Sequence, residues 1–365
     1  MQDSETDTSD ESPSLGPLAG LRILDLCSVV SGPMAAVMLA DQGADVIKIE
    51  PPGWGDGIRN LGASRNGQSA IFALINRNKR SIGINLKHPA GADIVRRLAE
   101  SADVVMQNYR PGRMGRLDLG YEALRKLNPE LIYTSISGVG EVGPYSEQRV
   151  FDYVIQGLSG VVDAQSTDGE PKMVRTILYD KLTALTAAQG ITAALLARER
   201  GQGGTHVKLS MLDAGIYFNW PELMWNCSFE GEGVDYSGEL ADMYNVSKTN
   251  DGYIVSHHLG ADTTGYSTDE LVELLTANEV AVARVNSRED VLTDPQVEAM
   301  KLLHRFNHPR GGNMVLPRSP VRFGEDEWSQ QRPSPEVGQH TVEVLSELGM
   351  TMPEMQALAR EQAIG

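Results

Sequence analysis

The chain has 365 residues, of which 41% are hydrophobic and 22% are charged, a composition typical of a soluble globular protein. The formal net charge of −17 at pH 7 argues against a nucleic-acid or membrane partner, because an acidic surface repels polyanions. No apolar run reaches the ~20 residues needed to span a bilayer. The length favours one large domain with a smaller one.

The N-terminal region and the cysteines indicate the cellular setting. The chain begins MQDSETDTSDE, which is acidic and unlike a secretory signal peptide. Residues 1–14 carry no basic side chain, and we expect a disordered, solvated tail. Two cysteines, Cys27 and Cys227, are too few for a disulfide framework. We therefore expect a reducing, cytoplasmic setting.

The first ordered elements have a strand–helix–strand pattern. The apolar run at 22–27 is typical of a buried strand. A helix is expected over 33–43, with Pro33 suited to its first turn, and DVIKIE at 45–50 predicts a second strand. This order predicts a parallel, doubly wound α/β sheet of the Rossmann type.

The alternation continues for most of the chain. Further strands are predicted at 80–86, 103–108, 131–138, 205–212 and 251–260, and helices at 88–102, 122–130, 180–200, 212–225, 269–280, 288–300 and 336–349. The segment after Asn226 is rich in glycine and loops. We therefore expect a large α/β domain at 15–225, a smaller α+β domain at 227–300, and a segment 301–365 that returns to the large domain.

A dinucleotide site is one interpretation of the first strand–helix–strand unit, because Glu50 follows the second strand. The glycine fingerprint of such sites is missing, since Gly32-Pro33 stands where G-x-G-x-x-G is needed. The sequence therefore disfavours an NAD(P) enzyme. Basic residues instead follow several strands, and if they converge they would hold a polyanionic ligand; these are Arg77, Lys79, Arg80, Lys87, Arg110, Arg113 and Arg116.

One acid stands out at the start of the predicted helix 180–200. Asp180 does not continue the apolar stripe of VRTILYDKLTALTAAQG, and its nearest basic neighbour is Lys181. Asp is a preferred residue at a helix N-cap, so Asp180 is either a cap or a reactive group. If it reacts, the helix N-terminus is expected to help keep it ionised.

Several segments, in order, resemble the class III CoA-transferase family, which includes the α-methylacyl-CoA racemases. The matching stretches are LAGLRILDL, SGPMAAVMLADQGADVIKIEPP, NRNKRSIGINLK, DVVMQNYRPGRMGRLDLGYEALRKLNPELIYTSISGVGEVGP, FDYVIQGLSG and ILYDKLTALTAAQGITAALLARERGQGGTHVKLSMLDA. The resemblance spans about 19–215 and weakens beyond that range. It implies a Rossmann-like large domain, an interlocked homodimer and an acyl-CoA substrate, with no tightly bound cofactor and no metal.

The resemblance also assigns residues. It makes Asp180 the nucleophile, which would form mixed-anhydride and aspartyl-CoA thioester intermediates during CoA transfer from an acyl-CoA donor to a small carboxylate. The positions that match CoA contacts are Val30, Ser31, Ile84, Asn85, Leu86, Lys87, Asn108, Tyr109, Arg110, Arg116, Arg149, Val150, Phe151 and Asp152. From its sequence alone, Asp152 could equally cap a helix.

The sequence departs from the family in ways that keep two alternatives open. Racemases carry a His-Asp pair where this chain has Phe151-Asp152, so one base of two-base proton transfer is missing. The smaller domain looks tens of residues short after His258, which leaves a non-catalytic CoA-binding relative as the other alternative. His257 and His258 have poor spacing for one metal, and with Asp262 they are weak candidates for substrate contacts. His206 is expected to be structural.

Overall fold

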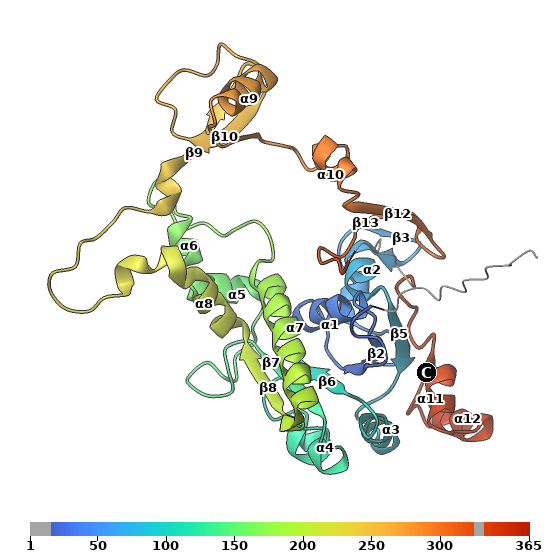
Figure 1. The fold of residues 1–365 in the computed structure, drawn as a ribbon. Coiled ribbons are helices and arrows are strands. Elements are labelled where there is room, and N and C mark those ends of the chain that lie inside the picture. The colour runs from blue at the N-terminus through green and yellow to red at the C-terminus, as the bar shows by residue number, and fades with distance from the viewer. Residues whose placement is uncertain (1–15, 325–331) are drawn as a thin grey trace, which may run out of the picture. The chain divides into compact units, whose positions relative to one another are not determined.

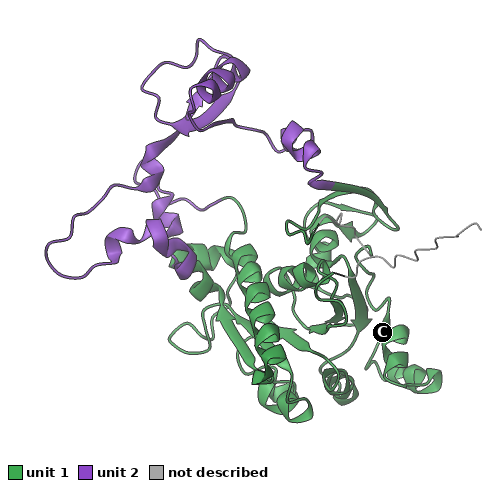
Figure 2. Ribbon diagram, viewed as in Figure 1, with its two compact units in different colours: residues 1–158, 175–215, 304–365 green, residues 159–174, 216–303 purple. Residues whose placement is uncertain are grey.

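The structure is a computed structural model that describes residues 16–324 and 332–365. The predicted acidic tail at 1–14 lies outside the described residues. The chain divides into two compact units, shown in Figure 2. Unit 1 comprises the described part of residues 1–158 together with 175–215 and 304–365, and unit 2 comprises 159–174 and 216–303.

The centre of unit 1 is a six-stranded sheet whose neighbouring strands are all parallel. Its order is β5 (Lys79–Gly83), β2 (Asp45–Glu50), β1 (Arg22–Asp25), β6 (Val104–Gln107), β7 (Ile132–Ser137) and β8 (His206–Ser210). Numbered along the chain this order is 3-2-1-4-5-6, which is the order of a Rossmann sheet. The predicted Rossmann-like parallel sheet is therefore confirmed.

Helices cover both faces of this sheet. Successive residues of a strand point to opposite faces, so each strand contributes apolar side chains to two separate clusters. Ile23 and Val46 belong to one apolar cluster, with α1 (Ser31–Ala40) and α7 (Tyr179–Ala197). Leu24 and Ile47 belong to the other, with the helices α3 (Pro89–Ala99), α4 (Tyr121–Leu127), α11 (Thr341–Glu347) and α12 (Met352–Arg360). Alanines line the facing sides of α1 and α7, so these helices approach closely (Figure 1).

Two strands of the sheet are followed by connections that lead away in opposite directions. The connection after β1 leads to β2 on one side, and the one after β6 leads to β7 on the other. Ligands of open α/β sheets bind outside the carboxyl ends of the strands at such a switch point. The loops after β1 and β6, which begin near Leu26 and Asn108, are therefore the first place to look for a site.

The last segment of the chain protects the edge strand β5. The backbone N–H of His340 donates to the carbonyl of Ser81, and the hydroxyl of Thr341 accepts from the N–H of Gly83. Smaller elements complete unit 1: η1 (Gly57–Asn60), β3 (Ser64–Arg65), β4 (Gln68–Ser69), α2 (Ala70–Asn76), η2 (Gly115–Leu117), α5 (Asp152–Leu158), η3 (Arg198–Gln202) and β13 (Gly312–Pro317). Two elements run across the division between the units, namely α8 (Met211–Leu223) and β12 (Leu303–His308).

Unit 2 contains a three-stranded antiparallel sheet in the order β11 (Val282–Arg284), β10 (Tyr253–His257), β9 (Tyr244–Lys248). Helix α9 (Thr268–Ala277) packs on this sheet and begins with a capping box between Ser267 and Glu270. Its other elements include α6 (Val161–Ala164), η4 (Trp225–Cys227) and η5 (Leu240–Met243).

The single helix predicted over 288–300 is wrong. The chain forms η6 (Asp290–Leu292) and then α10 (Pro295–Ala299). Asp294 separates them, because its side chain accepts from the N–H groups of Gln296 and Val297 and Pro295 disfavours a helical residue before it.

Candidate active site

The first turn of α7 is capped by a carboxylate from another helix. Asp152 opens α5, and its Oδ1 accepts from the backbone N–H of Tyr179 at 2.6 Å and of Asp180 at 3.1 Å. Its Oδ2 accepts from Nε2 of Gln156 at 2.7 Å. Leu178 occupies the N-cap position and has no capping side chain. Asp152 is therefore the cap, and the interpretation of Asp180 as an N-cap is wrong.

Asp180 is the second residue of α7 and is only 8% exposed. Desolvation by burial, together with the nearby charge of Asp152, raises the pKa of its carboxyl group to about 6, against hydrogen bonds from the backbone N–H and hydroxyl of Ser31, which lower it. Desolvation outweighs the hydrogen bonds from Ser31, and the expected help from the helix N-terminus stays a prediction. At pH 7 roughly ten ionised molecules still exist for each protonated one.

A cavity of about 820 Å³ in unit 1 lies at the carboxyl ends of the parallel strands. Segments that follow β1, β2, β5 and β6 all contribute to its wall, as expected for a Rossmann sheet. Of the residues that the sequence predicted as CoA contacts, it brings together Ile84, Asn85, Leu86, Lys87 and Tyr109. Lys87 is exposed, and the guanidinium of Arg113 lies 4.7 Å from the centre of the Tyr109 ring.

The remaining predicted contacts lie elsewhere. Val30 and Ser31 are buried at the N-terminus of α1, where Ser31 donates to Asp180, and Asn108 is turned toward Ser28, with which it exchanges hydrogen bonds of 2.9 and 2.7 Å. Arg110 lines a separate cavity of about 110 Å³. Other side chains do not line the 820 Å³ cavity, namely Arg116, Arg149, Val150, Phe151 and Asp152. The guanidinium of Arg149 lies 5.0 Å from the centre of the Phe151 ring.

Three of the basic residues that we expected to converge on a polyanion are instead structural. Arg77 pairs with Asp41 at 2.7 Å, and Lys79 pairs with Asp25 at 2.8 Å. Arg80 pairs with Asp45 at 2.6 Å. These side chains are buried and their charges are neutralised, so they are not available to a ligand. Only Lys87 and Arg113 of the predicted basic set line the 820 Å³ cavity.

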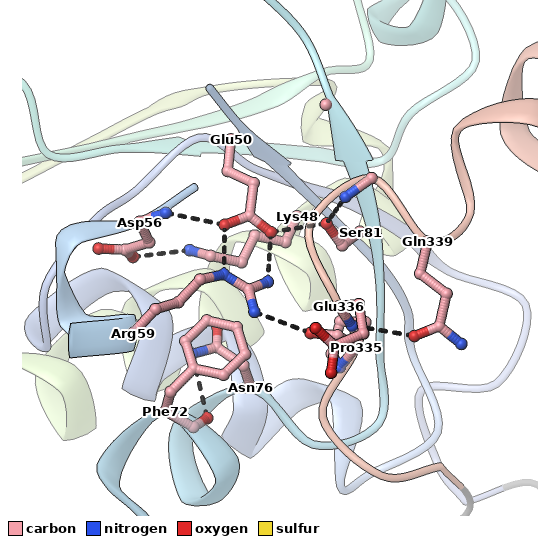
Figure 3. Close-up of polar contacts among 12 residues, drawn as sticks. Lys48, Glu50, Asp56, Arg59, Phe72, Asn76, Ser81, Pro335, Glu336 and Gln339 are labelled. Atoms are coloured by element: carbon pink, nitrogen blue, oxygen red, sulfur yellow. Dashed lines mark hydrogen bonds and ion pairs between the residues drawn. The ribbon is translucent and has the colours of Figure 1, made fainter. Parts of the chain in front are cut away.

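Glu50 does not offer a free carboxylate to a ribose. Figure 3 shows both of its oxygens occupied: Arg59 donates to them at 2.6 and 2.9 Å, and the hydroxyl of Ser81 donates at 2.6 Å. The backbone N–H of Asp56 donates to the same carboxylate at 2.8 Å. Like the missing glycine fingerprint, these contacts argue against a dinucleotide site at the first strand–helix–strand unit. Sequence reasoning missed the segment PPGWGDG after β2, although Trp54 and Asp56 line the cavity.

The histidines and cysteines have modest roles. His206 lies near the rings of Tyr121 and Tyr133, and its Nε2 is 2.9 Å from the Ser135 hydroxyl, as expected for a structural residue. His257 is exposed and lies against Tyr244 in unit 2. Both cysteines are free thiols. Within residues 16–324 and 332–365, no group of three His, Cys, Asp or Glu side chains could hold a metal, and no helix is long and apolar enough to cross a membrane.

Comparison with known proteins decides the family. The sequence profile of CoA-transferase family III matches residues 18–264 and 255–341. The chain belongs to CoA-transferase family III, and it is an enzyme. This CoA-transferase is 33% identical to the succinate–glutarate CoA-transferase of Agrobacterium fabrum, over 94% of this chain and 98% of the relative. It is 33% identical to the succinyl-CoA:glutarate CoA-transferase of Mus musculus, over 92% of this chain and 87% of the relative.

A solved structure gives the same result. A CAIB/BAIF family protein from Brucella suis superposes on this CoA-transferase with a TM-score of 0.80 and 28% identity, covering 91% of this chain and 99% of that protein. The predicted family is therefore confirmed by sequence and by fold.

Proposed function

We propose that this enzyme transfers CoA from an acyl-CoA donor to a small carboxylate, with Asp180 as the covalent nucleophile. The observation that carries the proposal is the state of Asp180: it lies buried at a helix N-terminus and is free of the capping role that Asp152 fills. A carboxylate with a raised pKa is also more nucleophilic than an ordinary one. The names of the two relatives, succinate–glutarate CoA-transferase and succinyl-CoA:glutarate CoA-transferase, favour a dicarboxylate as one partner.

The reaction proceeds by two exchanges at the carboxyl group of Asp180. Its Oδ attacks the thioester carbonyl, the C–S bond breaks, and a mixed anhydride and CoA thiolate form. The thiolate attacks the aspartyl carbonyl carbon and the donor leaves as its carboxylate, so the enzyme holds an aspartyl-CoA thioester. The acceptor carboxylate then reverses the sequence and leaves as the new acyl-CoA. Each bond formed replaces one of similar energy, so neither ATP nor a metal is required.

The 820 Å³ cavity is the proposed CoA site. Lys87 and Arg113 carry charges suited to CoA phosphates, and Ile84, Leu86 and Tyr109 offer apolar surface for the adenine. Ser28 and Val29 also line the cavity, and they lead directly into Ser31, whose donors meet Asp180. The turn after β1 would therefore guide the pantetheine arm toward the nucleophile. The proposed active form is the interlocked homodimer that the family resemblance implies, and no tightly bound cofactor takes part.

Trapping the intermediate tests the proposal. The enzyme is incubated with succinyl-CoA or acetyl-CoA and hydroxylamine, and peptides are mapped by mass spectrometry. We expect a hydroxamate at Asp180 in the wild type and none in D180N, which should still bind CoA. A hydroxamate at another residue, or none in a preparation that turns over, overturns the proposal. Deuterium exchange at the α-carbon of an acyl-CoA without CoA transfer would instead indicate a racemase, and CoA binding without transfer to any carboxylate would indicate a non-catalytic relative.

A further inference from the structure

Residues 27–29 form the turn that leads into Ser31, the first residue of α1, and this turn is held by side chains. The N–H of Cys27 donates to Oδ1 of Asp25 at 3.0 Å, and its carbonyl accepts from Nζ of Lys48 at 3.1 Å. Asn108 binds both the N–H and the carbonyl of Ser28. The N–H of Val29 donates to Oδ1 of Asp56 at 3.1 Å. Three successive peptide units are thus fixed by side chains from β1, β2 and the loops after β2 and β6.

Val29 adopts a conformation that it would not choose alone. Its φ is 70°, in the left-handed region, where a β-branched residue is a genuine outlier. Such conformations persist where the surrounding structure enforces them, and they gather at functional sites. The bonds of Val29 to Asp56 and of Ser28 to Asn108 are the enforcing contacts here.

Asp56 is itself fixed from several directions. Its Oδ2 pairs with Nζ of Lys48 at 2.9 Å, and both side chains are almost fully buried, at 1% and 0% exposed. Its Oδ1 also accepts from the N–H of Ile58 at 3.1 Å, and its own N–H donates to Glu50 (Figure 3). A buried ion pair is weak evidence for a gain in stability, because desolvation offsets much of the attraction. A gain in stability therefore does not explain why Lys48 and Asp56 form a buried ion pair here.

We propose that Asp56 is a positioning residue for Asp180, acting through the N–H of Val29 on the turn that aims Ser31. The proposal rests on the proposed function, since it assigns a purpose to the donors of Ser31. In the absence of the Asp56 acceptor, Val29 relaxes out of the left-handed region. Ser31, two residues further on, then no longer directs both its N–H and its hydroxyl at the Asp180 carboxylate.

Two paired variants separate the hydrogen bond to Val29 from the ion pair. In K48M/D56N both charges are gone, but the amide oxygen of the substituted side chain can still accept from Val29. In K48M/D56L the charges and the acceptor are both gone. We expect K48M/D56N to keep most of the turnover, and K48M/D56L to lose roughly 10- to 100-fold in kcat, as for a small displacement of a positioning group. We also expect the acid limb of the pH–rate profile to move to higher pH only in K48M/D56L, because Ser31 no longer favours the ionised Asp180.

Controls exclude general destabilisation and distinguish the two proposals. D41N removes the charge from the comparably buried Arg77–Asp41 pair, and it should lower the melting temperature without moving the acid limb. Equal kcat and equal acid limbs in K48M/D56N and K48M/D56L overturn the positioning proposal, even when the hydroxamate forms at Asp180. Absence of that hydroxamate in an active wild type overturns the proposed function instead.

A glycine variant keeps the test decisive if K48M/D56L does not fold. Glycine adopts φ near 70° without steric cost, so V29G/K48M/D56L should fold and have a kcat closer to that of K48M/D56N. If K48M/D56L is soluble, a folded triple variant whose kcat is no higher than that of K48M/D56L contradicts the proposal. If K48M/D56L does not fold, a triple variant whose kcat is more than about 100-fold below that of K48M/D56N contradicts it.

Discussion

The Oδ1 atom of Asp152 lies 3.1 Å from the backbone nitrogen of Asp180, so one acid caps the helix on which the other is mounted. The same contact has two opposite effects. It satisfies the N–H groups at the start of α7, and it places a negative charge beside the Asp180 carboxyl group, which raises its pKa. The proposed nucleophile is therefore held by the group that disfavours its charge.

Turnover should depend on the ionisation of Asp180. Because the carboxylate is the attacking form and its pKa is about 6, kcat/KM should rise with pH up to about 6 and level off above that value. A pH–rate profile between pH 4.5 and 8, with circular dichroism at each pH, measures this limb. A rate that stays flat down to pH 4.5 in a folded protein would contradict the prediction.

Replacement of Asp180 by asparagine should stabilise the protein at neutral pH. The pKa of the carboxyl group is 3.8 in the absence of its surroundings and about 6 in the folded protein. The folded state therefore binds the proton more tightly, and the stability contributed by the protonated form is complete below pH 3.8 and is lost as the pH rises through 6. At pH 8 the ionised form costs up to about 3 kcal/mol, which D180N avoids.

Urea unfolding at pH 8 and at pH 4.5 measures the effect of D180N. The gain in unfolding free energy should be large at pH 8 and small at pH 4.5. D41N serves as the matched control, since Asp41 is paired with Arg77 and its loss should destabilise the protein at pH 8. A D180N variant that is less stable than the wild type at pH 8 would show that burial does not penalise this charge.

Two substitutions of Asp152 should separate its capping role from its charge. D152A removes the acceptor for the N–H groups of Tyr179 and Asp180 and should cost about 1–2 kcal/mol. D152N keeps an amide oxygen as acceptor and should cost less. Both remove the neighbouring charge, so both should move the acid limb of kcat/KM to lower pH. E122Q, at an exposed acid in the first turn of α4, should change neither quantity, and identical unfolding free energies for D152A and D152N would argue against the cap.

Lys87 and Arg113 should each contribute to CoA affinity. Replacement of either by alanine should raise the Kd for CoA roughly tenfold, with less salt dependence than the wild type, because one charge–phosphate contact is lost. Isothermal titration calorimetry at two salt concentrations measures both effects. R125A, whose side chain is exposed and pairs with Glu122 on α4, is the control and should bind as the wild type does. Unchanged affinity in K87A and R113A would place CoA outside the 820 Å³ cavity.

Local patterns in the sequence predicted the sheet because each strand is a short apolar run between turn residues. DVIKIE forms β2 over the predicted residues 45–50, and the helix expected over 180–200 appears as α7. Helix α12 was missed although its signal was present, since Thr351 and Glu354 have the spacing of the capping box that they form. The break in the helix predicted over 288–300 was also indicated by the sequence, because Asp294-Pro295 favours the start of a turn.

Other features depend on partners far away along the chain. Asp152 caps a helix that begins 27 residues later, so neither its role nor the release of Asp180 from capping could be inferred from local spacing. Arg80 binds Asp45 and also Glu347, which is 267 residues distant. Its charge looked available in the sequence because the neutralising acids lie in other segments. Non-local pairing is therefore what separates the structural cations from those that line the cavity.

The cover over the edge strand β5 has a consequence for how the protein is made. His340 binds Ser81 from a position 259 residues later in the chain. A ribosome adding about 5–20 residues per second needs roughly 15–50 s to synthesise that interval, and during this time the strand has no native cover. Nascent chains of this enzyme therefore depend on late closure of unit 1, and until then they expose an open β-edge of the kind that chaperones protect from aggregation.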